Sequence, residues 1–216
     1  GMEHSFWHDR WESGRIGFHQ GEPNKLLVAH FHALGLAEGS RIFLPLCGKT
    51  RDIAWLLSQG YQVAGAELSE MAIRQLFEEL EVEPAISDLG ELKRYSAPDI
   101  DIFVGDVFAL TKTTLGPVDG VFDRAAFVAL PKDMRTAYAP HITQVTGTAP
   151  QLLITFEYDT SVLDGPPFSI DSDELEQRYG DSYELSTLAV DDVAGGFKGF
   201  EAFERVWFLK PLTPRK

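Results

Sequence analysis

The stretch RIFLPLCGKTRDIAWLLSQGYQVAGAEL, residues 41–68, carries the clearest pattern of secondary structure in the chain. Residues 41–48 form an apolar run that ends at a glycine, which indicates a buried strand. Residues 50–60 carry apolar side chains along one helical stripe and end at Gly60, the pattern of an amphipathic helix with a glycine stop. Residues 61–68 indicate a second strand. This order predicts two parallel strands joined by a helix that covers the sheet.

The alternation of strands and helices continues through the rest of the chain. We expect further helices at 23–36, 69–80, 131–145 and 171–180, and further strands at 100–110, 118–130, 150–159, 183–190 and 200–209. Pro131 opens one of these helices, and Pro140 is a candidate break within it. The last two strands follow each other directly and indicate an antiparallel hairpin at one edge of a parallel sheet. This outline fits a Rossmann-like class I methyltransferase sheet, and also a nucleotide-binding Rossmann domain.

The composition narrows the classes of partner. The chain has 216 residues, 44% of them apolar, which suits a single domain with a sizeable core. Its formal net charge of −14 argues against a partner with a phosphate backbone and against an anionic membrane surface. Cys47 is the only cysteine, so no disulfide forms within the chain, and no run approaches the roughly 18 apolar residues that span a bilayer. We expect a cytoplasmic monomer with no nucleic-acid, membrane or metal partner.

The candidate site residues follow the strands. In an open parallel sheet, ligands bind beyond the carboxyl ends of the strands, where the strand order reverses. Gly48 follows the first strand and allows a tight turn against a ligand, but the G-x-G-x-x-G pattern of dinucleotide sites is missing. Glu67 follows the second strand, nineteen residues after Gly48, where an acidic side chain accepts the hydroxyls of an adenosine ribose. An exposed loop glutamate is the alternative, and the sequence does not decide between them.

Further candidates follow the third and fourth strands. Asp106 suits the amino group of an adenine, with Val107 and Phe108 against the ring, and a turn cap is the alternative role of Asp106. Arg124 leaves a strand that we expect to be buried, where an arginine needs a partner. That partner is either the neighbouring Asp123 or the carboxylate of an amino-acid group on a ligand. Together these residues suit S-adenosylmethionine better than a nicotinamide cofactor.

The N-terminal segment FWHDRWESGRIGFHQGEP, residues 6–23, combines aromatic side chains with glycines. Trp7 and Trp11 are four residues apart and share one face of a helical turn. We expect residues 2–23 to form an aromatic lid whose rings contact a cation and exclude water, with Phe18 at the acceptor. The alternative is that both tryptophans pack on the sheet.

Five segments resemble the thiopurine S-methyltransferase family in its bacterial form. They are FWHDRW (6–11), IGFHQGEPN (16–24), LPLCGKTRDIAWLLSQGYQVAGAELSE (44–70), DRAAFVALP (123–131) and EYDTSVLDGPPFSI (157–170). The resemblance extends from about residue 6 to residue 210, and the tryptophan-rich opening together with the PLCGK turn makes it distinctive. The halide/thiol methyltransferases share the style of the opening and the GPPF loop and are the nearest rival family.

The resemblance implies a single class I methyltransferase domain over residues 2–216, with a seven-stranded, mostly parallel sheet, helices on both faces and an antiparallel C-terminal strand. The cofactor is then S-adenosylmethionine, with S-adenosylhomocysteine as its product. The implied cofactor-binding residues are Trp11, Leu46, Glu67 and Arg124, extended by Asp106, Val107 and Phe108 around the adenine, and the acceptor pocket is formed by Phe18, Pro166, Pro167 and Phe168.

The acceptor is less closely determined. Family members often carry a longer C-terminal helix with an arginine that faces the acceptor. Here residues 190–200, VDDVAGGFKGF, are glycine-rich, and Lys198 is the only basic residue among them. We expect methyl transfer to the sulfur of a thiopurine-type thiol, with another thiol or a selenium or tellurium species as the open alternative. A nucleotide-dependent oxidoreductase, which the missing glycine pattern disfavours, and a methyltransferase fold without turnover are the other interpretations.

Overall fold

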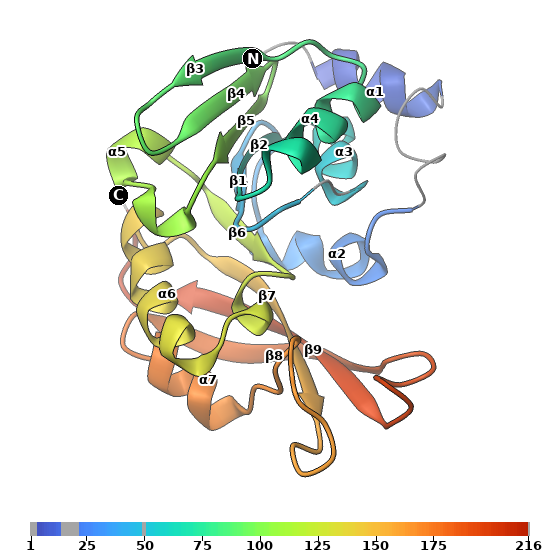
Figure 1. Cartoon of the computed structure of the whole chain (residues 1–216), viewed down its shortest axis with the longest axis vertical. Coiled ribbons are helices and arrows are strands. Elements are labelled where there is room, and N and C mark those ends of the chain that lie inside the picture. The colour runs from blue at the N-terminus through green and yellow to red at the C-terminus, as the bar shows by residue number, and fades with distance from the viewer. Residues whose placement is uncertain (1–3, 14–21, 49–50, 216) are drawn as a thin grey trace.

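The computed structural model describes residues 4–13, 22–48 and 51–215, and its centre is a nine-stranded sheet between helices (Figure 1). The strand order is β3-β4-β5-β2-β1-β6-β7-β9-β8. The strands are β1 (Arg41–Leu44), β2 (Gln62–Glu67), β3 (Ala85–Asp88), β4 (Lys93–Ala97), β5 (Ile100–Val104), β6 (Gly120–Asp123), β7 (Gln151–Tyr158), β8 (Tyr183–Asp192) and β9 (Ala202–Pro211).

Helices cover both faces of the sheet. The α-helices are α1 (His4–Glu12), α2 (Lys25–His30), α3 (Arg51–Ser58), α4 (Glu70–Glu79), α5 (Lys112–Leu115), α6 (Lys132–Val145) and α7 (Ser172–Tyr179), and the 3₁₀ turns are η2 (Phe31–Leu34), η3 (Val107–Ala109) and η4 (Phe127–Ala129). Buried side chains of α1 to α4 form one core cluster with the sheet, and those of α5 to α7 form a second cluster on the opposite face. The two clusters enclose the sheet in a three-layer α/β sandwich.

The centre of the sheet is parallel and contains the switch point. β1 pairs with β2 on one side and with β6 on the other, and β2–β5 and β6–β7 are parallel as well. The chain moves outward from β1 to β2 and β5, then returns to the other side of β1 at β6. The carboxyl ends of β1, β2, β5 and β6 therefore meet at one edge, around the point where the order reverses. The predicted fold class is confirmed.

The strand count exceeds the expected seven because of a hairpin that the sequence did not signal. β3 and β4 pair antiparallel in the polar stretch 84–99, and β4 pairs antiparallel with β5. All four residues of β3 are exposed. An edge strand of this kind lacks both the apolar run and the alternation that reveal strands in a sequence.

Side chains cap two of the helices. Ser69 accepts a hydrogen bond from the backbone N–H of Ala72 at 3.1 Å and caps the N-terminus of α4. Asp171 caps α7 in the same way. The predicted break at Pro140 is wrong, because α6 continues through it to Val145 and buries Tyr138 and Ile142 against the sheet.

The first helix lies at the end of the sheet where the parallel strands begin, away from the switch point. Trp7 is buried, and its Nε1 atom donates to the carbonyl oxygen of Pro98, just before β5 begins. Arg10 donates to the carbonyl oxygens of Leu80 and Glu81 at the end of α4. Trp7 therefore packs in the core, as in the alternative considered above, and does not form part of a cover over the strand exits.

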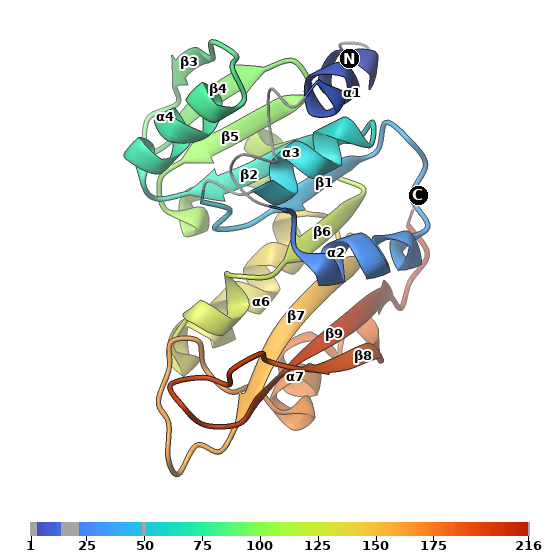
Figure 2. The same ribbon diagram turned by 90° about the vertical axis from the view of Figure 1, so that its right-hand side faces the viewer.

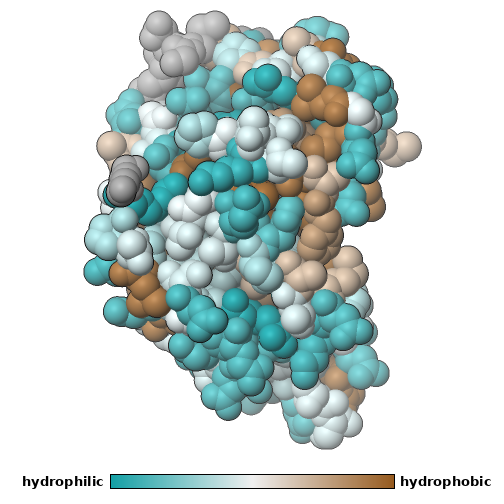
Figure 3. Space-filling view, turned by 90° about the vertical axis from the view of Figure 1, so that its left-hand side faces the viewer, coloured by the Kyte–Doolittle hydropathy of each residue, from teal (hydrophilic) through white to brown (hydrophobic). Residues whose placement is uncertain are grey.

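Hydrophilic residues occupy most of the face seen in Figure 3, as the composition suggests. No described helix combines the length and the apolar character needed to cross a membrane. Within the same residues, no group of three or more histidine, cysteine, aspartate or glutamate side chains is placed to hold a metal ion.

Candidate functional site

Gly48 and Glu67 lie side by side at the exits of β1 and β2. A Cβ atom at Gly48 would lie 3.6 Å from Oε1 of Glu67, and Gly48 has a φ of +58°, which favours glycine. The other carboxylate oxygen of Glu67 accepts the backbone N–H of Ser69 at 2.7 Å. An ionised carboxylate has about four acceptor positions, so Glu67 retains capacity for the hydroxyls of a ligand.

The β1 exit is unusual in its backbone. Leu46 is a non-glycine residue with a φ of +48°, and such conformations gather at functional sites. The next residue, Cys47, donates its N–H to the carbonyl oxygen of Ala66, which ties this turn to β2. Burial and, to a smaller extent, the charge of Glu67 raise the pKa of the Cys47 thiol. Cys47 is therefore a packing residue and a poor nucleophile.

Asp106 and Phe108 lie at the exit of β5. Asp106 is exposed, and its Oδ1 atom accepts the backbone N–H of Phe108 at 2.9 Å, the capping role that was the alternative for this residue. The ring of Phe108 is half-buried and lies 5.4 Å from the ring of His141. Val107 is buried in the second core cluster, so Phe108 offers the more accessible side chain of the pair.

Asp123, the last residue of β6, is completely buried and does not pair with Arg124. Its Oδ1 atom accepts the backbone N–H groups of Ala126 and Phe127, and its Oδ2 atom accepts the hydroxyl of Tyr138 at 2.8 Å. Burial raises the pKa of Asp123 to about 6, and these hydrogen bonds oppose that rise. The carboxylate thereby shapes the turn that carries Arg124.

Arg124 is exposed and lines a cavity of about 340 Å³ beside the exits of β6 and β7. Its remaining lining residues are Ala125, Val128, Ala129, Phe156, Pro166, Pro167 and Glu204. The cavity thus brings together Arg124, which we expected at the cofactor, and two prolines that we expected at the acceptor. Most of its wall is apolar, with two ionisable side chains, which is typical of a site for a small organic ligand.

The GPPF loop forms the outer wall of this cavity. The Gly165–Pro166 and Pro166–Pro167 peptide bonds are both cis. Tyr158 donates its hydroxyl to the carbonyl oxygen of Pro167, and Phe168 donates its N–H to Val128. A Cβ atom at Gly165 would come within 2.4 Å of the Phe168 ring, so only glycine fits there. Phe168 itself packs against the second core cluster and does not line the cavity.

The tip of the β8–β9 hairpin lies against the same wall. The ring of Phe197 is 5.8 Å from that of Phe156 and 5.4 Å from that of Tyr158, both on β7. Figure 2 shows this tip and the loop after β7 extending from the same end of the sheet. The glycine-rich stretch 190–200 therefore contributes an aromatic ring behind the cavity.

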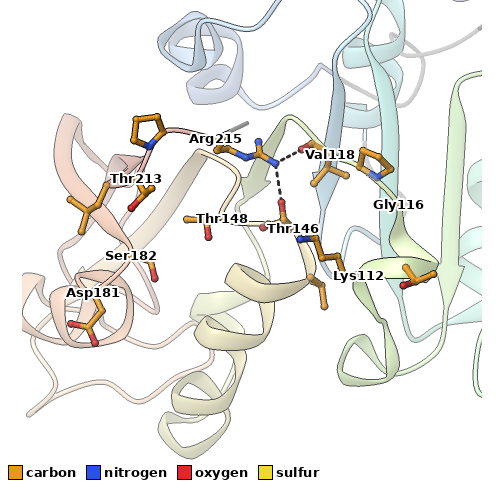
Figure 4. A pocket seen from close by; sticks show the side chains of 15 residues that line it. Lys112, Gly116, Val118, Thr146, Thr148, Asp181, Ser182, Thr213 and Arg215 are labelled. Atoms are coloured by element: carbon orange, nitrogen blue, oxygen red, sulfur yellow. Dashed lines mark hydrogen bonds between the residues drawn. The ribbon is translucent and has the colours of Figure 1, made fainter.

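A larger cavity, of about 790 Å³, lies at the opposite end of the parallel strands (Figure 4). It is lined by residues that precede β6 and β7, among them Val118 and Thr146, and by the C-terminal segment. Arg215 donates to the carbonyl oxygens of Val118 and Thr146 and fastens that segment to the sheet. Because this edge holds the amino ends of the parallel strands, we assign the site to the smaller cavity.

Two of the predicted site residues lie outside what the structure describes. Trp11 belongs to α1, but its side chain is not among the described parts, and Phe18 is not described at all. Glu204 was missed by the sequence reasoning. Glu204 lies between the buried Ala202 and Val206 on one face of β9. A single acid on an otherwise apolar strand face is the signal that would have found it.

Comparisons with known proteins give one family over nearly the whole chain. A family model described as thiopurine S-methyltransferase matches residues 2–210. A thiopurine S-methyltransferase from Xanthobacter autotrophicus is 56% identical over 211 residues, which cover 97% of this chain and 99% of that protein. A second, from Gluconobacter oxydans, is 48% identical and covers 97% of this chain and 96% of that protein.

Solved structures show the same fold at low sequence identity. A methyltransferase dependent on S-adenosylmethionine from Methanosarcina mazei has a TM-score of 0.62 and 15% identity, covering 86% of this chain and 98% of that one. TehB from Haemophilus influenzae has a TM-score of 0.61 and 16% identity, covering 94% of this chain and 67% of that one.

Proposed function

The chain belongs to the thiopurine S-methyltransferase family, and from this premise we propose how its site works. The enzyme is an S-adenosylmethionine-dependent S-methyltransferase. The exits of β1, β2 and β5 hold the adenosine part of the cofactor, and the 340 Å³ cavity beside β6 holds a small thiol acceptor. The observation that carries this assignment is that Arg124 stands at the exit of β6 and also lines the cavity.

The side chains at the strand exits fit this cofactor. Glu67 offers hydrogen-bond acceptor positions to the ribose hydroxyls. Because Gly48 has no side chain, the Glu67 carboxylate beside it stays accessible. Asp106 and Phe108 provide a carboxylate and a ring for the adenine, and Arg124 provides a cation for the carboxylate of the amino-acid group. Leu46 and Trp11 are assigned to the same site by the family resemblance.

The acceptor cavity suits a flat or compact organic thiol. Phe156, Pro166 and Pro167 give it apolar walls, while Arg124 attracts an anionic sulfur. When bound, the cofactor supplies an electrophilic methyl group on a positively charged sulfur. The protein's own contribution is to hold the acceptor sulfur in line with that group, an effect that reaches several kcal/mol in well-oriented reactions. Apolar walls also keep water from the acceptor sulfur.

The acceptor class is tested by methyl transfer from labelled S-adenosylmethionine to 6-mercaptopurine, a simple aryl thiol, bisulfide and iodide, offered side by side. We expect turnover of the thiopurine and of the aryl thiol. Turnover of only iodide or bisulfide would place the activity with the halide/thiol methyltransferases. Binding of cofactor without turnover of any acceptor would contradict the proposed acceptor class.

We also propose that the enzyme acts as a cytoplasmic monomer on small molecules. The net charge of −14 supports the exclusion of nucleic acid. Size-exclusion chromatography with light scattering tests the oligomeric state, and a particle mass above the 24.1 kDa of one chain would contradict a monomer.

A further inference from the structure

The acceptor cavity contains two ionisable side chains, Arg124 and Glu204, and only the first has a role so far. Glu204 lies on β9 directly opposite Phe156 of β7, and opposite Asp191 of β8 on its other side. Residues opposite each other in neighbouring strands point to the same face of a sheet. The Glu204 carboxylate is thus built into the wall of the cavity beside Phe156.

This carboxylate has no structural partner among the described residues. It accepts no hydrogen bond and forms no ion pair within 4 Å there, although it is half-buried. A neighbouring acid on β7 shows the contrast. Glu157, which follows Phe156, binds Arg205 through both carboxylate oxygens. A half-buried carboxylate without such a partner is costly for the fold, and this cost points to a function.

Charges from three elements act on Glu204. Burial raises its pKa above the ordinary value of a glutamate, and the charge of Asp191 on β8 adds to the rise. Arg124 at the β6 exit and Lys25 on α2 act in the opposite direction. A carboxyl group whose pKa is moved toward neutrality is better suited to accept a proton at working pH.

We propose that Glu204 is the general base that takes the proton from the acceptor thiol. The S–H bond breaks, the proton forms an O–H bond with a Glu204 oxygen, and the electron pair stays on sulfur, which is then the nucleophile. Glu204 later returns the proton to water. Arg124, in the same cavity, stabilises the negative charge that develops on the sulfur. This assignment rests on the proposed S-methyltransferase function and adds the group that prepares the acceptor.

The test compares two acceptors in wild type and in Glu204→Gln. A nitro-substituted thiophenol is ionised at neutral pH and needs no base, whereas 2-mercaptoethanol is mostly protonated and does. We expect Glu204→Gln to lower kcat/KM for 2-mercaptoethanol by about 100-fold or more and to leave the nitrothiophenol within about threefold. Glu184→Gln, an equal charge change at an exposed position of the same hairpin, is expected to change neither.

A second measurement follows the charges around Glu204. Asp191→Asn is expected to move the acidic limb of the 2-mercaptoethanol profile to lower pH, and Lys25→Gln is expected to move it to higher pH. Carbon NMR of the Glu204 carboxyl in the protein without cofactor is expected to show the same two shifts. The signal is assigned by its loss in Glu204→Gln.

Each outcome decides between the alternatives. An equal loss of kcat/KM with both thiols, or no loss with either, would overturn the general-base role of Glu204. An acidic limb that stays at the same pH in both Asp191→Asn and Lys25→Gln would overturn it as well. Failure of wild type to methylate these two thiols and also the thiol acceptors of the preceding section would overturn the S-methyltransferase activity, and with it this inference. Turnover of the nitrothiophenol without turnover of 2-mercaptoethanol in wild type would overturn the general-base role alone. Calorimetric affinity for S-adenosylhomocysteine is expected to be the same in wild type and Glu204→Gln, which separates loss of the base from loss of the fold.

Discussion

Tyr138 donates its hydroxyl to the Oδ2 atom of Asp123 across 2.8 Å, and both side chains are completely buried. One residue lies on α6 and the other at the end of β6, so the hydrogen bond joins a helix to the strand exit beside the proposed acceptor cavity. The same carboxylate holds the backbone of the following turn. Arg124 is positioned through this arrangement.

Replacing Tyr138 by phenylalanine is expected to destabilise the protein by about 1–3 kcal/mol, because a buried carboxylate loses a hydrogen bond. Urea unfolding followed by fluorescence measures the change. Tyr158→Phe is the matched control, since its hydroxyl bonds a carbonyl at the half-buried Pro167, and we expect about 1 kcal/mol or less there. Equal losses in the two variants would contradict a special role of the buried pair.

Asp123 is expected to make stability depend on pH. Its pKa is 3.8 in an ordinary environment and about 6 in the fold, so the folded state binds the proton more tightly. The stabilisation that this provides is complete below about pH 4 and is lost as the pH rises through 6. Between these values, the unfolding free energy of Asp123→Asn relative to wild type should increase by roughly 3 kcal/mol. A difference that stays constant with pH would contradict the buried titration.

Glu67→Gln is expected to weaken binding of S-adenosylhomocysteine roughly 10- to 100-fold, because charged hydrogen bonds to the ribose hydroxyls are lost. Isothermal titration calorimetry measures this affinity. Glu78→Gln, an exposed position on α4 with the same charge change, serves as the control. Unchanged affinity in Glu67→Gln would reduce Glu67 to a turn residue that holds the N–H of Ser69.

Glu174→Gln is expected to cost about 3–5 kcal/mol of stability, because it leaves the buried charge of Arg135 without its partner. The Arg135 side chain is only 6% exposed and binds both oxygens of Glu174, at 2.7 and 3.0 Å. The more exposed pair of Glu157 and Arg205 is the comparison, and Glu157→Gln should cost about 1 kcal/mol or less. Thermal unfolding of the two variants under one condition distinguishes these values.

Trp7→Phe is expected to reduce stability by roughly 1–3 kcal/mol and to leave cofactor affinity unchanged. Trp7 packs in the core and donates to Pro98, at the edge away from the strand exits. A loss of affinity without a loss of stability would show that α1 acts at the cofactor after all. The part of the predicted lid that includes Phe18 is tested separately, by deleting residues 14–20 and measuring the same affinity.

The sequence predicted the elements whose residues are buried on both faces. The β1, β2 and β5 runs are mostly apolar and mostly buried, so both the strands and the position of Glu67 at the end of β2 followed from the pattern. The β3–β4 hairpin was not predicted, because it lies at the edge of the sheet and exposes most of its side chains. Solvent on both faces removes the pattern on which such predictions depend.

The positions of the candidate residues in the fold were predictable where they depend on strand exits and not where they depend on distant contacts. Arg124 was placed correctly after a buried strand. Of its two alternative partners, Asp123 is excluded, because Tyr138, fifteen residues further along the chain, binds that carboxylate. The Glu174 carboxylate on α7 likewise binds a residue of a separate helix, Arg135 of α6. Partners from separate elements are set by packing, which no local pattern reveals.

The position of β9 has a consequence for the synthesis of the enzyme. β9 leaves the ribosome after the other eight described strands, yet it fills the gap between β7 and β8. Until residues 202–211 emerge, β7 presents an unpaired edge whose first five residues are buried in the finished sheet, and β8 has no neighbour. Such edges pair readily with other chains. The side of the sheet with the proposed acceptor cavity is thus completed after the other described strands, so a chain that stalls before β9 is expected to aggregate and not to persist as a cofactor-binding fragment.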